Sequence, residues 1–349
     1  MRIAIILPSL AKKGPIVYCR YLVEGLIDKV DYIEIFYFKD IVELKMPVKT
    51  TQINFFHKID FSKFDVIHTH NALPDLYAFK NRCQSKWLTT MHDMYKEQLL
   101  LTHNWYRAWL IIILWSLALK RVKYVVVFST ALKDYYNQKL RDKEIFKIPT
   151  GVSEKTPKSI SIEDRKLLKK LKSDFILVGA SGLLTKRKGF RQLVKFLASN
   201  PDYAVAITGD GEEREFLLNY AKKLKVDDRL VLFGFKDNAI DYYQYYDVYV
   251  LPSYAEGLPL SLLEAMSQRL PIVCSNLKIY HDYFSSSDVS FFEVDNQQSL
   301  QNAILSAFDE KEIYKHKAYR LFKENFSIAA MAEKYLELYK KIALDNKKL

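Results

Sequence analysis

Two glutamates, Glu256 and Glu264, flank a turn and the start of an apolar helix. Gly257 and Pro259 place this turn directly after a strand-like run, residues 248–251. Unpaired amides at a helix start attract phosphate, whereas a carboxylate repels phosphate and accepts both hydrogens of a vicinal diol. A ligand with a diphosphate over the turn and a diol on each side would bind both the amides and the two glutamates. A nucleotide sugar has these groups, so the segment indicates a sugar-nucleotide site. The alternative is that Glu264 only favours an early helical turn and Glu256 is a solvated loop residue.

This segment resembles the GT-B glycosyltransferases of family 4, whose hallmark is a Glu-x7-Glu pair, and the resemblance covers essentially the whole chain. It implies that Glu256 lies near the donor sugar and that Glu264 binds the nucleotide ribose. It also implies that the backbone of the turn faces the sugar and the diphosphate through Gly257, Leu258, Pro259 and Leu260.

Three cations, residues 186–188, precede Gly189 in the loop after a predicted strand at residues 175–179. Positive charge at this place would stabilise the charge that develops on a leaving nucleoside diphosphate. The family has a Lys-Gly here, which implies that Lys188 is a phosphate ligand. The family's upstream arginine falls on Leu183, and Arg187 is expected to substitute for it from a different angle. The alternative is a solvated basic turn.

Three further residues are assigned from the same resemblance. His92 ends a strand-like run and is implied to contact the transferred sugar. Phe235 follows another strand, where the family places the nucleotide base, so it is either a stacking face or a core phenylalanine. Gly14 is the one match to the family's glycine pair near the diphosphate and acceptor. Pro15 has no N–H to donate to a phosphate, so this loop is expected to have a narrower role or a different geometry.

No metal site is expected. His68 and His70 would share one face of an extended strand, but no third ligand can be named. The three cysteines are far apart and lack a Cys-x-x-Cys spacing, which predicts neither a zinc site nor a disulfide framework and favours a reducing, cytoplasmic location. No cofactor is expected beyond the donor substrate, a UDP-sugar or GDP-sugar.

The chain has 53 lysines and arginines against 41 acidic residues, a formal net charge of +12. Such a surface attracts anions in general. Because the lysines are spread out and form no long basic block, nucleic-acid binding is not expected.

The apolar segment Trp105–Leu119 has two interpretations. It is too short to span a membrane, which takes roughly twenty apolar residues. It is either a core helix behind a sheet or an interfacial helix on an anionic membrane surface. In the second case its tryptophans would lie at the membrane interface and the neighbouring cations would contact anionic headgroups.

Strand-like runs alternate with helical segments along both halves of the chain, at residues 3–7, 33–38, 66–68, 87–90 and 124–128, and again at 175–179, 204–208, 230–233, 248–251 and 271–274. This alternation predicts an α/β protein with two Rossmann-like, doubly wound parallel sheets. Residues 1–150 are expected to form the acceptor-side domain and residues 151–325 the donor-side domain, with a cleft between them. Residues 326–349 are expected to form a helix that crosses back to the first domain.

These features predict a retaining, metal-independent glycosyltransferase that moves a hexose-type sugar from a nucleoside diphosphate to a glycan. The expected acceptor is a lipid-linked oligosaccharide of bacterial surface-polysaccharide synthesis, such as O-antigen or capsule, and the expected location is cytoplasmic, with possible peripheral attachment to the plasma membrane. Two alternatives stay open: a GT-B sugar-nucleotide epimerase, and a peripheral membrane-binding protein without transferase activity.

Overall fold

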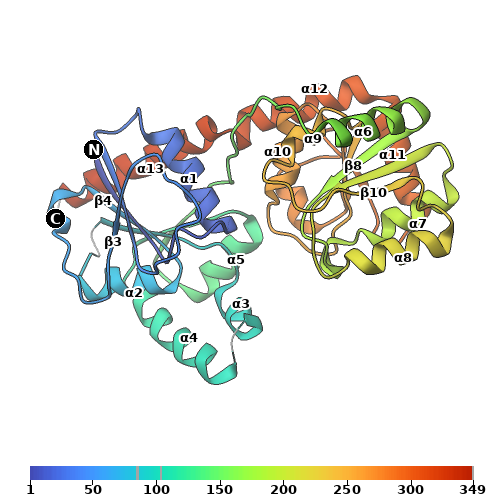
Figure 1. Ribbon diagram of the computed structural model, residues 1–349. Helices are drawn as coiled ribbons and strands as arrows, with labels where there is room; N and C mark the ends of the chain where they lie inside the picture. Colours follow the sequence, from blue (N-terminus) through green and yellow to red (C-terminus); the bar gives the residue numbers. More distant parts are fainter. Residues whose placement is uncertain (84–85, 103, 348–349) are drawn as a thin grey trace. The chain divides into compact units, whose positions relative to one another are not determined.

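The computed structural model describes residues 1–83, 86–102 and 104–347. The chain folds as two compact units, residues 1–151 with 328–349 and residues 152–327. Each unit is a parallel β-sheet with helices packed around it (Figure 1). The predicted fold class of two doubly wound sheets is confirmed.

The first unit has seven strands in the order β3-β2-β1-β4-β5-β6-β7. Its strands are β1 (Arg2–Leu7), β2 (Tyr32–Tyr37), β3 (Lys49–Gln52), β4 (Val66–His70), β5 (Trp87–Thr90), β6 (Tyr124–Val127) and β7 (Glu144–Lys147). Its helices are α1 (Gly14–Leu26), α2 (Ala72–Lys80), α3 (Tyr95–Thr102), α4 (Trp105–Leu119), α5 (Thr130–Lys139) and α13 (Ile328–Lys347), with a 3-10 turn η1 (Phe61–Lys63).

The second unit has six strands in the order β10-β9-β8-β11-β12-β13. Its strands are β8 (Ile176–Ser181), β9 (Tyr203–Thr208), β10 (Leu230–Leu232), β11 (Val248–Leu251), β12 (Ile272–Ser275) and β13 (Ser290–Phe292). Its helices are α6 (Ile162–Asp174), α7 (Arg191–Ser199), α8 (Arg214–Leu224), α9 (Ile240–Tyr243), α10 (Leu260–Ser267), α11 (Gln297–Asp309) and α12 (Lys311–Leu321), with short turns η3 (Lys186–Lys188), η4 (Lys278–Asp282) and η5 (Phe322–Phe326).

Strands β1, β9 and β11 are buried on both faces, which is why their sequences are nearly continuous apolar runs and not alternating ones. The central strands β4 and β5 are equally buried but end in histidine and threonine residues. In the second unit, side chains of β8, β9 and β11 form one core with α7, α8 and α11. A rigid sheet of this kind fixes the start of every loop that leaves its carboxyl edge.

Helix α13 completes the first unit although it comes from the far end of the chain. It packs closely on α1, where a Cβ added to Gly25 would lie 2.6 Å from Ile328 Cγ2. Its Tyr339 hydroxyl lies 2.7 Å from His68 Nδ1 in β4, and its Tyr335 hydroxyl bonds Thr90 at 3.0 Å. These buried polar contacts fix α13 against the sheet.

The segment Trp105–Leu119 forms α4, which packs against α2 and α3. Ala108, Ile112 and Trp115 are buried on one side, whereas Trp109 and Ile113 on the other side are 52% and 54% exposed. The core-helix interpretation therefore accounts for only half of this helix. No helix in the described part of the chain combines the length and apolar character needed to cross a membrane.

Candidate functional site

The strand order of the second sheet reverses at β8: later strands add first on one side of it and then on the other. This strand, the first of its unit along the chain, pairs with β9 on one side and β11 on the other. The loops that follow β8 and β11 therefore start side by side, and ligands of open α/β sheets bind outside such a pair of carboxyl ends. The predicted cations lie in the first loop and Glu256 in the second.

Hydrogen bonds to backbone carbonyls hold these two loops together. The amide of Tyr254 donates to the carbonyl of Arg187 at 2.8 Å, and Gln192 Nε2 donates to the carbonyl of Pro252 at 2.8 Å. Gly189 has a φ of +67°, and a Cβ added there would lie 2.0 Å from the Pro252 oxygen. Both the left-handed backbone and the close approach call for glycine at this position.

The two loops bring Glu256 between two cations. Lys188 Nζ lies 2.7 Å from Glu256 Oε1, and Arg187 Nη1 lies 3.2 Å from Oε2. The side chains of Glu256 and Lys188 are only 6% and 11% exposed, whereas that of Arg187 is 55% exposed. Two cations share one carboxylate, so this cluster carries an excess positive charge and suits an anion.

Leu183 stands where the resembling family has an arginine, and its side chain is 63% exposed. Arg187 precedes Lys188 in the same turn, η3, and both side chains contact the carboxylate of Glu256; Arg187 Nη1 also donates to the carbonyl of Ala255 at 2.7 Å. Both cations thus contact the same carboxylate, that of Glu256. The role of Arg187 in binding the donor stays a prediction.

Glu264 lies on α10, directly after the turn. Burial raises the pKa of its carboxyl to about 7, an effect that the positive charge of Lys155 opposes. Among the described residues, none donates a hydrogen bond to this carboxyl. It is therefore a largely buried acceptor whose charged form would gain from hydroxyl donors.

The turn between the two glutamates is open. A Cβ added to Gly257 would meet nothing within 4 Å. No described backbone carbonyl accepts from the amides of Gly257 or Leu258. Pro259 is the extended N-cap of α10, and Leu260 is the first helical residue. These amides are available to an anion at the helix start.

Phe235 lies in the loop after β10, at the same carboxyl edge of the second sheet. The amide of Gly209 donates to the carbonyl of Gly234 at 2.8 Å, which ties this loop to the one after β9. The Phe235 side chain is 68% exposed, so the interpretation as a core phenylalanine is wrong. Stacking on a base stays a prediction.

In the first unit, His92 follows β5 and lies beside a second histidine at the end of β4. His92 Nε2 is 3.0 Å from His70 Nδ1. Burial lowers the pKa of His92 to about 3 and that of His70 well below its ordinary value, so both rings are neutral at physiological pH. His70 Nε2 is buried without a hydrogen-bond partner among the described residues.

The rings of His68 and His70 lie on one face of β4, as their alternation suggested, with centroids 4.3 Å apart and planes tilted by 36°. Both nitrogens of His68 are engaged, at 2.7 Å by the Tyr339 hydroxyl and at 2.7 Å by Thr90 Oγ1. No group of three or more metal-ligating side chains occurs in the described ranges. Gly14 opens α1, is exposed, and has no atom within 4 Å of an added Cβ.

Tyr280, in η4 after β12, was not predicted from the sequence. Its hydroxyl is buried and has no hydrogen-bond partner among the residues that the structure describes. Burial raises its pKa well above the ordinary value, and the nearby Glu256 carboxylate adds to the effect. Only its position after a strand that neighbours β11 could have marked it, since tyrosines also fill the core of this unit.

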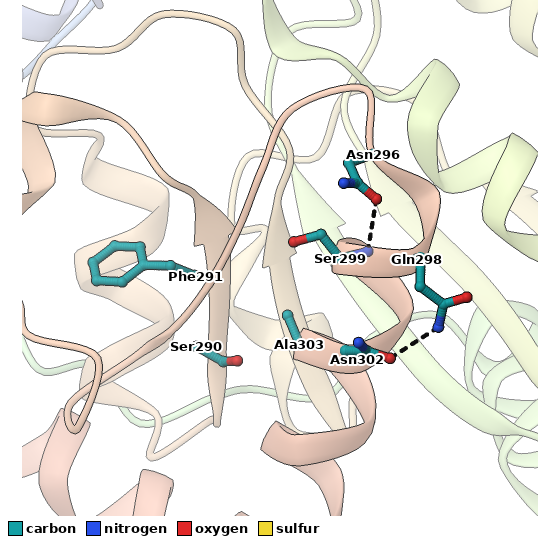
Figure 2. Close-up of a pocket in the computed structure, with 7 residues that line it drawn as sticks. All are labelled: Ser290, Phe291, Asn296, Gln298, Ser299, Asn302 and Ala303. Atoms are coloured by element: carbon teal, nitrogen blue, oxygen red, sulfur yellow. Dashed lines mark hydrogen bonds between the residues drawn. The ribbon is translucent and has the colours of Figure 1, made fainter.

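A separate hollow of the second unit lies between β13 and α11 (Figure 2). It is lined by Ser290, Phe291, Asn296, Gln298, Ser299, Asn302 and Ala303. The amide of Ser299 donates to Oδ1 of Asn296, the N-cap of α11, and Gln298 Nε2 donates to Asn302 Oδ1. None of the predicted site residues lines this hollow.

Comparison with known families gives two matches along the chain. Residues 161–328 match the family described as "Glycosyl transferases group 1", and residues 44–155 match "Glycosyltransferase Family 4".

Individual relatives agree with these matches. The O-antigen biosynthesis glycosyltransferase WclY of Escherichia coli is 27% identical over 97% of this chain and 98% of its own. The UDP-Gal:alpha-D-GlcNAc-diphosphoundecaprenol alpha-1,3-galactosyltransferase of the same species is 29% identical over 55% of this chain and 53% of its own.

Solved structures share the fold. HepE of Anabaena, solved with UDP, aligns with a TM-score of 0.79 at 15% identity over 98% of this chain and 100% of its own. A sucrose-phosphate synthase of Thermosynechococcus elongatus aligns with a TM-score of 0.75 at 19% identity over 98% of both chains.

Proposed function

Because the chain belongs to the family 4 glycosyltransferases of the GT-B fold, we propose that it transfers a hexose-type sugar from a nucleoside diphosphate to a glycan hydroxyl with retention of configuration. The observation that carries this proposal is the cluster of Lys188, Arg187 and Glu256, which lies where the loops after β8 and β11 meet.

In the proposed reaction Lys188 and Arg187 exchange the Glu256 carboxylate for the diphosphate of the donor. In the free protein they hold Glu256, and with donor bound they hold the diphosphate. As the bond between the sugar and the diphosphate breaks, negative charge grows on the leaving group, so Lys188 and Arg187 stabilise the transition state more than the ground state. This is the most direct use of an excess positive charge in a cluster whose Lys188 and Glu256 are nearly buried.

The exchange frees Glu256 to accept hydrogen bonds from hydroxyls of the donor sugar. Glu264 takes the ribose diol, because its buried carboxyl has no donor among the described residues and gains two from the diol. The free amides of Gly257 and Leu258 contact the diphosphate, and Phe235 supplies a face for the base. His92 contacts the sugar as a neutral donor or acceptor.

Retention follows from attack on the face that the leaving group vacates. The acceptor oxygen forms a bond to the anomeric carbon as the carbon–oxygen bond to the diphosphate breaks. The acceptor proton passes to the departing phosphate oxygen, so atoms and charge balance without a protein nucleophile. We further propose that no divalent metal is needed, because Lys188 and Arg187 supply positive charge where one would act.

We propose a lipid-diphosphate-linked oligosaccharide as acceptor, in O-antigen or related surface-polysaccharide synthesis. The support comes from the names of the two Escherichia coli relatives, one of which includes a diphosphoundecaprenol acceptor. Such an acceptor places the enzyme at the cytoplasmic face of the plasma membrane.

Two alternative functions would behave differently. A sugar-nucleotide epimerase would consume donor with no acceptor present, whereas a transferase forms a new glycan only when an acceptor is supplied. A membrane-binding protein without activity would bind vesicles and leave donor unchanged. The matches to two glycosyltransferase families favour the transferase.

The test is a binding screen followed by turnover. UDP-, GDP- and ADP-sugars are compared by thermal shift, since a ligand that binds only the folded state raises its melting temperature. The best donor is then supplied with a lipid-diphosphate-linked glycan, with and without a chelator, and the product anomer is determined by NMR. Retained configuration and chelator resistance are expected. An inverted product or acceptor-independent conversion of the donor would refute the proposal.

A further inference from the structure

The outer side of α4 is an apolar surface that the fold of its own unit does not use. Its residues follow the helical repeat and are 43% to 70% exposed. We call them the α4 face: Trp105, Tyr106, Trp109, Leu110, Ile113, Leu114 and Leu117. Figure 1 shows α3 and α4 projecting beyond the helices that lie next to the first sheet.

The inner side of α4 already supplies the packing that the fold needs. Ala108, Ile112 and Ala118 are buried against the neighbouring helices, and Trp115 Nε1 donates to the buried Asp75 of α2 at 2.6 Å. A helix that is apolar on all sides is usually enclosed on all sides or in contact with lipid. The α4 face therefore calls for an occupant outside its unit.

Charge indicates what that occupant is. Helix α4 contains no acidic residue, and its exposed cations are Arg107 within it and Lys120 and Arg121 directly after it. The exposed acid on the neighbouring α3, Glu97, already accepts a hydrogen bond from Tyr135 at 2.8 Å. An apolar stripe bordered by cations complements a surface with an apolar interior and anionic headgroups.

The aromatic residues favour a bilayer over a protein surface. Trp105, Tyr106 and Trp109 gather in the first turns of α4, and indole and phenol groups prefer the boundary between headgroups and acyl chains. Fifteen residues make a helix of about 22 Å, too short to span and long enough to lie in the interface.

We infer that the α4 face docks the protein on an anionic lipid bilayer, with α4 parallel to the membrane plane. The inference deepens the proposed function and rests on it in one respect: if the acceptor is lipid-linked, docking through the α4 face brings the enzyme to the membrane that holds this acceptor. A second copy of the chain, paired through the α4 face, is the competing occupant.

The test compares co-sedimentation of the full chain with phosphatidylglycerol vesicles and with phosphatidylcholine vesicles. The variant replaces both Ile113 and Leu117 by Glu. The matched control is Ile313→Glu on α12, a residue that is 50% exposed on the other unit. We expect wild type and control to bind phosphatidylglycerol vesicles, with weaker binding to phosphatidylcholine and at high salt, and the double variant to bind at least about tenfold less.

Three results would overturn the inference. One is a wild type that stays in the supernatant with phosphatidylglycerol vesicles, and another is a folded double variant that binds them as wild type does. The third is a wild-type dimer that light scattering shows to be split by the double variant, without vesicle binding. Circular dichroism establishes that the variant is folded.

Donor binding and transfer to a water-soluble acceptor separate this inference from the proposed function. Both readouts should be unchanged in the double variant, since no α4 residue belongs to the donor site. If wild type binds vesicles but no nucleotide sugar, the proposed function fails and the docking surface stands.

Discussion

The ammonium of Lys188 lies 2.7 Å from Oε1 of Glu256, and both side chains are nearly buried. The pair joins the loop after β8 to the loop after β11, two segments that are far apart in sequence. Lys188 thus has a carboxylate partner that an anionic ligand can replace.

Replacing Lys188 by Ala should lower kcat/KM by about 10²–10³-fold, because it removes one donor to the leaving diphosphate. Lys186→Ala is the control, since Lys186 lies in the same turn and is exposed. Steady-state kinetics with saturating acceptor measures the effect. Equal losses in the two variants would mean that charge near the turn matters in general and that Lys188 is not a specific ligand.

Glu264 should make the folded state less stable as pH rises through the window from about 4.5 to about 7. Its folded pKa is raised from the ordinary value of 4.5 to about 7, so in this window the folded state holds more protons than the unfolded state, and stability falls with increasing pH. Glu264→Gln should flatten this part of the curve of melting temperature against pH, by a few degrees. An identical curve for the variant would contradict the buried position of this carboxyl.

Donor binding should release protons near pH 7 if Glu264 accepts the ribose diol. Hydrogen bonds to the carboxylate favour its charged form and lower its pKa from about 7. Calorimetric titration with UDP in phosphate and in Tris should give different apparent enthalpies, and this difference should vanish in Glu264→Gln. A wild-type enthalpy that is independent of buffer would argue against this contact.

The histidines of the first unit should act in the opposite direction. Burial holds the pKa of His92 at about 3, below the ordinary 6.5, so the unfolded state binds more protons between these values. Stability should therefore fall as pH drops from about 6.5 towards 3. His92→Gln should lose less stability over this range than wild type does, as measured by urea unfolding at pH 7 and pH 5. No difference between the two proteins would place His92 in contact with solvent.

Gly189→Ala should destabilise the protein by about 1–3 kcal/mol, because its φ of +67° is strained for alanine. The added Cβ would also approach the Pro252 oxygen to 2.0 Å, which should displace Lys188 and lower turnover. Gly257→Ala is the matched control for stability, since its Cβ would meet nothing within 4 Å. Thermal unfolding measures both, and a stable Gly189→Ala would show that the loop can relax.

The sequence predicts ten strands within a few residues, because most buried parallel strands are apolar runs. It misses β3, β7 and β13, for separate physical reasons. β3 and β7 are four-residue edge strands with polar or charged ends, and β13 has only three residues. Edge strands are buried less, so their composition differs little from that of loops.

The candidate site is predictable as a set of residues and only partly as an arrangement. The types of Lys188 and Glu256 indicate their chemistry, but their contact depends on the adjacency of β8 and β11, which only the folded sheet establishes. For the same reason His70 and Tyr280 were not predicted beside His92 and Glu256. The two sides of α4 could not be distinguished, because both are apolar.

The placement of α13 has a consequence for how the chain matures. Residues 1–151 are synthesised before the second unit, yet Tyr335 and Tyr339, the partners of Thr90 and His68, are synthesised after it. The second unit is contiguous and can finish folding earlier. Until α13 has been synthesised, the nascent first unit lacks the helix that covers its β4 histidines and α1, and these surfaces are open to chaperones and proteases.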